Sequence, residues 1–419
     1  MSRMLKDWLD GYLTFTQFTE PKELYRKWVG ISTLASCLER KVFGKWVHTP
    51  TYANMYIVLV GPPGRPRKTT AIRQGLEFLQ EMDINLAADV ITKEALRRRL
   101  ANCTRMMTTV GTETSSVGLH ASMTIHAEEL TVFLGYKNLD LMTDLGAWYD
   151  CKDTWTYETK NKGVDDVKGV WVNLLGATTP ELLQTAIPKE LIGGGFASRL
   201  LMIYEDDLNK PIPYHKLTAE EIVLQEMLIQ DLRDVSILKG EFTLSPEYIT
   251  DYSAWYGMQM AQPIFMDSRL QAYESRRPTH IRKLSMIANV NHTNNMVLRT
   301  RDLLTAVEWL EEAEINLPRI YQDIGAQPLY ELEKQMGTWI ARQIQTRGPF
   351  RVSELVQQFQ SHVSNEDMSH LLMRFDMMDF CKAVKTAKNA PAIIQPGKML
   401  LQQLESRVDV SNNGQMKKG

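Results

Sequence analysis

A lysine followed by two threonines, Lys68-Thr69-Thr70, is the part of this sequence that could most directly carry chemistry. The segment "GPPGRP" precedes it, and the apolar run "MYIVLV" at 55–60 comes before that. In a phosphate-binding loop, backbone N–H groups and a lysine hold phosphates while a hydroxyl binds magnesium, and a strand and a helix flank the loop. The residues predicted to hold a nucleotide are Gly61, Pro63, Gly64, Arg67, Lys68, Thr69 and Thr70.

This loop departs from the usual GxxxxGK[ST] spacing. Seven positions separate Gly61 from Lys68, one more than usual, and Pro66 has no backbone N–H to offer a phosphate. The alternative interpretation is a proline-rich turn that happens to precede a helix. Acidic and polar residues further along the chain favour the nucleotide loop.

Two adjacent glutamates, Glu128 and Glu129, follow the apolar run "SMTIHA" at 122–127. Nucleotide hydrolysis needs a carboxylate near the magnesium ion and a second group that orients the attacking water. We expect Glu128 and Thr69 to serve the metal and Glu129 to serve the water. The alternative is a solvated helix start, since acidic residues favour a helix N-terminus.

Thr179 and Arg199 are two further catalytic candidates. Thr179 follows the apolar run "VWVNLLGA" and could bond the γ-phosphate or the water, but Thr-Pro-Glu is also a good helix start. Arg199 follows the glycine-rich "IGGGFAS", and an arginine supplied by a neighbouring subunit can stabilise a transferring phosphoryl group. An ordinary surface ion pair is the alternative for Arg199.

The elements that must position these residues are short apolar runs alternating with helical patterns, which predicts an α/β fold with a parallel sheet. The predicted strands are 55–60, 106–110, 122–127, 170–177 and 199–205. Our domain division is a helical cap at 1–50, an ATPase core at 51–210, a helical lid at 211–326, a winged-helix domain at 327–403 and a disordered tail at 404–419.

The segments "GPPGRPRKTT", "TIHAEEL", "NLLGATTPELL" and "GGGFASRLL" together resemble the AAA+ branch of P-loop ATPases. The resemblance is narrower to phage and mobile-element helicase-like ATPases close to the superfamily 3 helicases, and it covers roughly residues 20–325. It implies ATP and Mg²⁺ as cofactors, a ring usually of six subunits, and Arg199 acting on the next subunit's nucleotide. It also implies a second-sensor arginine in the lid, for which Arg276, Arg277 and Arg282 are candidates.

The segment "DTWTYETKNKGVDDVKGVWV" predicts a β-hairpin with Lys160 and Lys162 at its tip. In superfamily 3 rings a hairpin at this position projects into the pore, so we expect Lys160, Lys162 and Trp155 to contact single-stranded DNA by charge and stacking. The alternative is that the aromatic rings pack into the core. The predicted winged helix offers a second surface for DNA or for a protein partner.

These expectations combine into a ring-forming, ATP-dependent DNA helicase or translocase of phage or mobile-element replication. Its expected partners are single-stranded or forked DNA, further copies of the chain in a hexamer, and a primase or polymerase. The alternatives are an initiator or loader ATPase that uses ATP as an assembly switch, and a non-hydrolysing DNA-binding scaffold.

Composition sets the outer limits on function. The net charge of −2 over 419 residues argues against a global polyanion-binding surface. The four cysteines form no CxxC pair, so neither a zinc site nor a disulfide framework is expected. No apolar run approaches the ~18 residues of a membrane span, so we expect a cytoplasmic protein without a membrane partner.

Overall fold

The computed structural model describes residues 3–46, 49–88, 91–110, 115–135, 138–159, 163–186, 195–261, 263–265, 267–323, 328–359, 365–385, 391–402 and 404. The chain separates into two compact units, Met1–Ile324 and Gly325–Gly419. Within the described ranges, no helix has both the length and the apolar character to cross a bilayer.

A five-stranded sheet forms the centre of the first unit, in the order β4-β5-β8-β3-β9. Its strands are β3 (Tyr56–Val60), β4 (Thr104–Val110), β5 (Ser115–Ala127), β8 (Val170–Thr178) and β9 (Leu200–Tyr204). The neighbours β5-β8, β8-β3 and β3-β9 pair in parallel. The predicted mixed α/β fold with a mainly parallel sheet is therefore confirmed.

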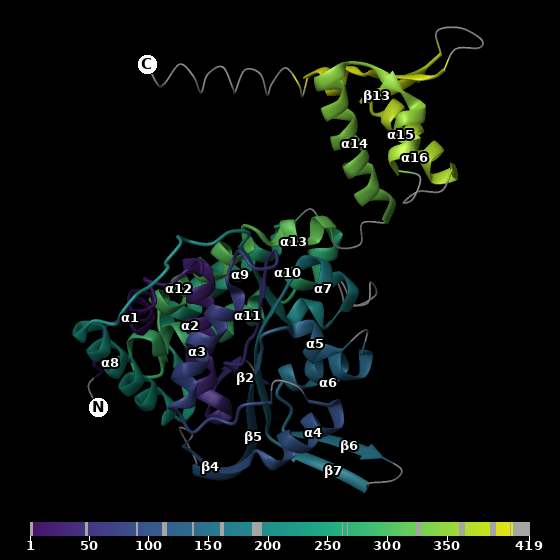
Figure 1. The fold of residues 1–419 in the computed structure, drawn as a ribbon. Coiled ribbons are helices and arrows are strands. Elements are labelled where there is room, and N and C mark those ends of the chain that lie inside the picture. The colour runs from purple at the N-terminus through teal and green to yellow at the C-terminus, as the bar shows by residue number, and fades with distance from the viewer. Residues whose placement is uncertain are drawn as a thin grey trace. The chain divides into compact units, whose positions relative to one another are not determined.

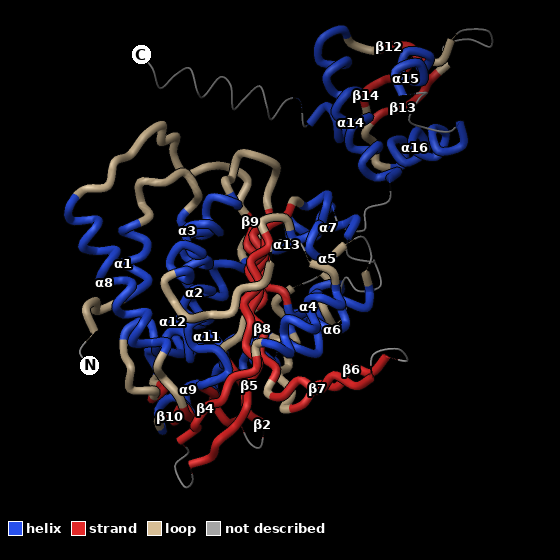
Figure 2. Tube along the Cα trace, turned by 60° about the horizontal axis from the view of Figure 1, so that its bottom comes forward, coloured by secondary structure: helices blue, strands red, loops and turns tan. Residues whose placement is uncertain are grey.

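Helices cover both faces of this sheet (Figure 2). Every residue of β3 and β8 is buried, which is why both strands read as continuous apolar runs in the sequence. One face is covered by α1 (Trp8–Phe15), α2 (Glu23–Leu38) and α3 (Lys68–Gln80), and the other by α4 (Lys93–Asn102), α5 (Leu130–Leu134), α6 (Leu139–Tyr149) and α7 (Pro180–Ala186).

Strand β4 differs from the prediction of a parallel strand, because it pairs antiparallel with β5. Only residues 111–114 separate the two strands. A parallel pair needs a crossover of a dozen or more residues, whereas antiparallel neighbours can be joined by a short turn. Strand β5 is also longer than predicted, since it begins at Ser115 and not at residue 122.

A second, smaller sheet in the first unit joins segments that lie far apart in the sequence, in the order β11-β10-β1-β2. Its strands are β1 (Val42–Trp46), β2 (Thr49–Tyr52), β10 (Gly240–Leu244) and β11 (Val297–Leu298). The remaining helices of this unit are α8 (Ala219–Ser236), α9 (Pro246–Ala261), α10 (Gln271–Glu274), α11 (Arg277–His292), α12 (Thr300–Glu314) and α13 (Leu317–Asp323), with short 3₁₀ turns at Glu39–Lys41, Ala197–Arg199 and Ser268–Leu270.

The hairpin predicted after residue 153 is present as β6 (Thr154–Thr159) paired antiparallel with β7 (Gly163–Lys168). Figure 1 shows it extending from the edge of the unit near α4. Lys160 and Lys162, which we expected at its tip, lie outside the described residues.

The second unit has a hydrophobic core of its own, which includes Met336, Ile340, Leu371 and Phe375. Its described residues include the helices α14, α15 and α16 and an antiparallel sheet in the order β12-β14-β13, followed by a helical segment from Lys398 (Figure 1). These elements are α14 (Pro328–Arg347), β12 (Phe350–Arg351), α15 (Val352–Phe359), α16 (Asn365–Met377), β13 (Cys381–Val384) and β14 (Ile393–Pro396).

Candidate functional site

The strand register brings the predicted nucleotide residues to one edge of the central sheet. Val60, the last residue of β3, lies opposite Thr178 of β8 and Tyr204 of β9. Strand β5 ends at Ala127, level with Gly176 of β8. The loop after β3, the glutamates after β5 and the threonine after β8 therefore leave the sheet at the same, carboxyl-terminal edge. This is where open α/β sheets bind ligands.

The loop between β3 and α3 is held by close backbone contacts. Gly61 donates its N–H to the carbonyl of Thr178 at 3.3 Å, and a Cβ at this position would lie 2.1 Å from the Glu205 carbonyl oxygen. Gly64 and Arg67 both have left-handed backbone conformations, with φ of 79° and 54°. A glycine is therefore required at 61 by packing and favoured at 64 by the backbone.

Lys68 is the first residue of α3, and its ammonium group turns back onto the loop. The Nζ atom donates to the carbonyls of Gly61 at 2.6 Å and Pro62 at 2.9 Å. Burial lowers the pKa of Lys68, while the nearby carboxylates of Glu129 and Glu181 raise it. A partly desolvated cation thus lies where the loop closes.

The N-terminus of α3 offers backbone donors beside that lysine. The preceding residue, Arg67, makes no side-chain capping bond, and the first turn of the helix contains no acidic residue. The first N–H groups of a helix have no partner within the helix and attract anions. Thr69 is half-buried here, whereas Pro63, Gly64 and Thr70 are exposed.

The two glutamates differ in what they contact. Both carboxylate oxygens of Glu128 accept from Arg73 of α3, at 2.5 Å and 2.8 Å. Glu129 accepts a 2.8 Å hydrogen bond from the Thr131 hydroxyl, and it lies within electrostatic reach of Lys68. Sequence reasoning missed Arg73, because a pairing between α3 and the end of β5 depends on the tertiary fold.

Thr179 caps helix α7, as its alternative interpretation predicted. Its hydroxyl oxygen accepts from the Leu182 N–H at 3.3 Å. The hydroxyl keeps its own proton, so the cap leaves a donor at the carboxyl edge of β8. Its predicted bond to a phosphate or a water remains a prediction.

Residues from the N-terminal segment support the loop, and sequence analysis did not identify them. The Tyr25 hydroxyl donates to the Val60 carbonyl at 2.6 Å and accepts from the Glu205 N–H at 3.2 Å, so it ties the ends of β3 and β9 together. Glu20 pairs with Arg67 at 2.6 Å. A single tyrosine or glutamate in a helical region carries no sequence signal for such a contact.

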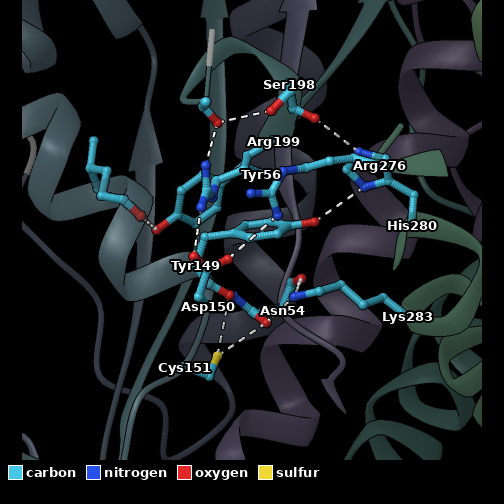
Figure 3. A network of polar contacts seen from close by, with 12 residues as sticks. Asn54, Tyr56, Tyr149, Asp150, Cys151, Ser198, Arg199, Arg276, His280 and Lys283 are labelled. Atoms are coloured by element: carbon cyan, nitrogen blue, oxygen red, sulfur yellow. Dashed lines mark hydrogen bonds and ion pairs between the residues drawn. The ribbon is translucent and has the colours of Figure 1, made fainter. Parts of the chain in front are cut away.

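Arg199 lies at the opposite edge of the sheet from Lys68. It directly precedes β9, whose first residue, Leu200, aligns with Tyr56 at the start of β3. Its guanidinium donates to Asp150 at 2.6 Å and also bonds the Gly195 carbonyl (Figure 3). Within one chain, Arg199 and the loop are therefore separated by the full length of the strands.

The three lid arginines occupy different environments. Arg277 is buried and forms a bidentate pair with Glu314, at 2.7 Å and 2.8 Å. Arg282 donates to the Tyr252 hydroxyl at 2.7 Å. Arg276 lies 3.5 Å from Asp150, the carboxylate that also binds Arg199 (Figure 3).

The aromatic residues of the hairpin pack against the protein. The ring of Trp155 stacks on that of Tyr157 at 5.9 Å and meets Trp148 edge-on at 5.4 Å. The Arg97 guanidinium lies 3.8 Å from the Tyr157 ring centre. Trp155 is half-buried, so the packing alternative describes these rings, and their contact with DNA remains a prediction.

The donor set fits a magnesium nucleotide. Across the described part of the chain, no three His, Cys, Asp or Glu side chains gather as a metal cage. Mg²⁺ in nucleotide sites is usually held by one or two protein groups and by the phosphates themselves, so such a cage is not required. Thr69 and Glu128 are the chain's candidates, with Lys68 and the start of α3 for the phosphates.

Comparison of the sequence with protein-family models and with curated proteins found no match.

Proposed function

We propose that this protein is an ATP-dependent, ring-forming motor of the AAA+ type that translocates along or unwinds DNA in phage or mobile-element replication. The observation that carries the proposal is the shared carboxyl-terminal edge of β3, β5 and β8. Three separated segments bring Lys68, the pair Glu128 and Glu129, and Thr179 to that edge. A proline-rich turn without function gives no reason for these side chains to meet there.

ATP bound with Mg²⁺ would supply the phosphoanhydride bond whose cleavage drives movement. Lys68 would exchange the loop carbonyls for phosphate oxygens, and the uncapped N–H groups of α3 would hold the same phosphates. Thr69 and Glu128 would hold the metal. Glu129, whose charge raises the pKa of Lys68, would orient the water.

The position of Arg199 supports action between subunits. It lies at the amino edge of the sheet, so its own loop is out of reach, whereas a neighbouring copy could present its loop to that edge. Arg276 shares the same carboxylate and is the lid arginine placed to accompany it. Arg277 is already paired in the interior.

Two parts of the chain are candidates for DNA contact. The hairpin β6-β7 extends from the unit and is the candidate for gripping a strand. In the second unit, the order of three helices followed by a β-hairpin is that of a winged helix, which we propose as a further contact for DNA or protein.

One observation favours the loader alternative. Arg73 occupies both carboxylate oxygens of Glu128, so this glutamate serves a metal only after that ion pair opens. A protein that holds ATP as an assembly signal would hydrolyse slowly for this reason.

The test is ATP hydrolysis with and without single-stranded DNA, by the parent protein and by Lys68→Ala, Glu129→Gln and Arg199→Ala. We expect turnover that rises with DNA and is lost in all three variants. Arg301→Ala, an exposed arginine outside the site, is the matched control and should keep full turnover.

Mixing the inactive Lys68→Ala and Arg199→Ala proteins tests the arrangement between subunits. In a mixed ring, some interfaces combine an intact loop with an intact arginine, so partial turnover should return. DNA-dependent assembly with negligible turnover in the parent protein would favour the loader. If the protein does not bind ATP, the non-hydrolysing DNA-binding scaffold is the remaining alternative.

A further inference from the structure

A pocket of about 350 Å³ lies at the amino edge of the central sheet, away from the nucleotide loop. It is bordered by β2, by the residues after α6 and by the first turns of α11. Its volume is within the range of small-molecule sites. The lining residues that matter here are Trp46, Asp150, Arg276, Thr279, Arg282 and Lys283.

The charges of this pocket are unbalanced. Arg276, Arg282 and Lys283 bring three cations, whereas Asp150 is the one carboxylate among the lining residues. That carboxylate is also shared with Arg199, which binds it at 2.6 Å, closer than Arg276 at 3.5 Å (Figure 3). Asp150 is therefore bound mainly by Arg199, which is not a lining residue, and it offsets little of the positive charge inside the pocket.

Two of the cations pair with neutral groups only, as far as the described residues show. Arg282 donates through Nε to the Tyr252 hydroxyl, which leaves its terminal amino groups for another acceptor. Lys283 donates to the backbone and side-chain oxygens of Asn54, at 3.0 Å and 2.5 Å. Neither Asn54 oxygen carries a formal charge, so among the described residues neither Arg282 nor Lys283 forms a direct ion pair.

The excess of positive charge affects the pKa of Lys283. Its side chain is buried, and that burial lowers its pKa to about 8, with Arg276 and Arg199 lowering it further against Cys151 and Asp150. A buried charge needs a paired counter-charge. Trp46, which also lines the pocket, has a buried indole N–H with no hydrogen-bond partner among the described residues.

We propose that this amino-edge pocket binds a phosphate-type oxyanion. Guanidinium groups bind phosphate oxygens in bidentate geometry, and an ammonium adds a point charge. Arg282 supplies a fixed donor, Lys283 adds a buried positive charge, and half-exposed Arg276 can turn from its long contact with Asp150. The phosphate could belong to a free molecule such as pyrophosphate or to a nucleic-acid strand.

The experiment uses the full chain carrying Lys68→Ala, so that the nucleotide loop lacks its cation. Pyrophosphate binding is measured by titration calorimetry in this background and after adding Arg282→Gln or Arg276→Gln. We expect saturable binding that each arginine substitution weakens by roughly tenfold or more, the loss of about one charge-assisted contact. Arg301→Gln is the matched control and should bind like the background protein.

Absence of pyrophosphate binding in the Lys68→Ala protein would overturn the proposal. Equal affinity in the two pocket variants and the control would overturn it as well. Arg276 is half-exposed, so Arg276→Gln keeps the test valid if Arg282→Gln fails to fold. A short oligothymidylate that competes with pyrophosphate would identify strand phosphates as the source, and one that does not compete would identify a free phosphate.

The pocket can be tested separately from the proposed motor function through Arg282, which has no role in the motor, whereas Arg276 takes part in both proposals. The pocket residues are not part of the nucleotide loop. The pocket can therefore bind phosphate even if Lys68→Ala leaves ATP hydrolysis unchanged, which would count against the motor. Conversely, loss of pyrophosphate binding in the pocket variants says nothing against the loop.

Discussion

Replacing Arg277 by methionine should destabilise the first unit and do so in a pH-dependent way. Arg277 and Glu314 are both buried, and their bidentate pair is joined by a 2.8 Å hydrogen bond from the Tyr273 hydroxyl to Glu314. Arg277→Met keeps most of the side-chain volume but leaves the carboxylate without its cation. Burial already raises the pKa of Glu314, and Arg277 is the main group that lowers it.

The magnitude follows from the cost of a lone buried carboxylate. Removing one partner of a buried pair costs about 3–5 kcal/mol. The unpaired carboxylate can become neutral by binding a proton, and this costs about 1.4 kcal/mol for each pH unit above its ordinary pKa of about 4.3. The charge-dependent loss is therefore limited to about 5 kcal/mol near pH 8 and about 1 kcal/mol near pH 5.

The direction of the pH dependence follows from Glu314, whose pKa is higher in the folded state than in the unfolded state. The folded state then holds the proton over a window in which the unfolded state has lost it, so stability falls as the pH rises through that window. Without Arg277 the folded pKa of Glu314 rises further and the window extends upward. The deficit of the variant should thus shrink as the pH is lowered.

Urea unfolding of the parent and Arg277→Met proteins at the two pH values checks this prediction. Arg276→Met is the control, because Arg276 is half-exposed and an exposed pair contributes at most about 1 kcal/mol. A deficit that is the same at both pH values, or that stays below about 1 kcal/mol near pH 8, would refute the reasoning about a stranded carboxylate.

Three further predictions concern single residues near the site. Thr179→Val should lower the unfolding free energy by about 0.5–2 kcal/mol because the cap on Leu182 is lost, and Thr179→Asn should restore it in urea unfolding; a Val variant as stable as the parent would contradict this. Arg73→Gln should release Glu128 and lower the magnesium concentration for half-maximal ATP hydrolysis by up to about fivefold, the value of an exposed ion pair, and an unchanged requirement would count against it. Burial lowers the pKa of His126 to about 4, so its contribution to stability is complete above pH 6.5 and is lost as the pH falls toward 4. In His126→Leu the unfolding free energy should therefore fall less steeply with pH over that range, and an equally steep fall would exclude the histidine as its cause.

Strands β3 and β8 could be predicted because they are buried on both faces. A fully buried strand must be apolar at every position, and this makes it easy to recognise. The other predicted strands also appear in the structure, although β4 is not buried and its Met106 is exposed. The direction of β4 was also within reach, because its four-residue connection to β5 is too short for a crossover. The second sheet was not, since it joins strands as short as Val297–Leu298 with partners far away in the sequence.

The candidate site was predictable in its chemistry but not in its contacts. The order of loop, carboxylates and threonine in the sequence indicated one sheet edge, and the register places them there. The pairing of Arg73 with Glu128 and the support from Tyr25 involve residues with no pattern of their own. Such contacts are decided by how α2 and α3 pack, which local spacing does not encode.

Strand β9 links the two candidate sites of each chain. Arg199 precedes its first residue, and Glu205, whose carbonyl lies against Gly61 of the loop, follows its last. Five residues of extended chain span about 16 Å and cannot slide without breaking their ladder with β3. In a ring, β9 would be a rigid connection between the nucleotide loop and Arg199. A shift of the loop on binding or losing phosphate would then also move the arginine that faces the next subunit. The spacing between successive sites would then be fixed by one short strand.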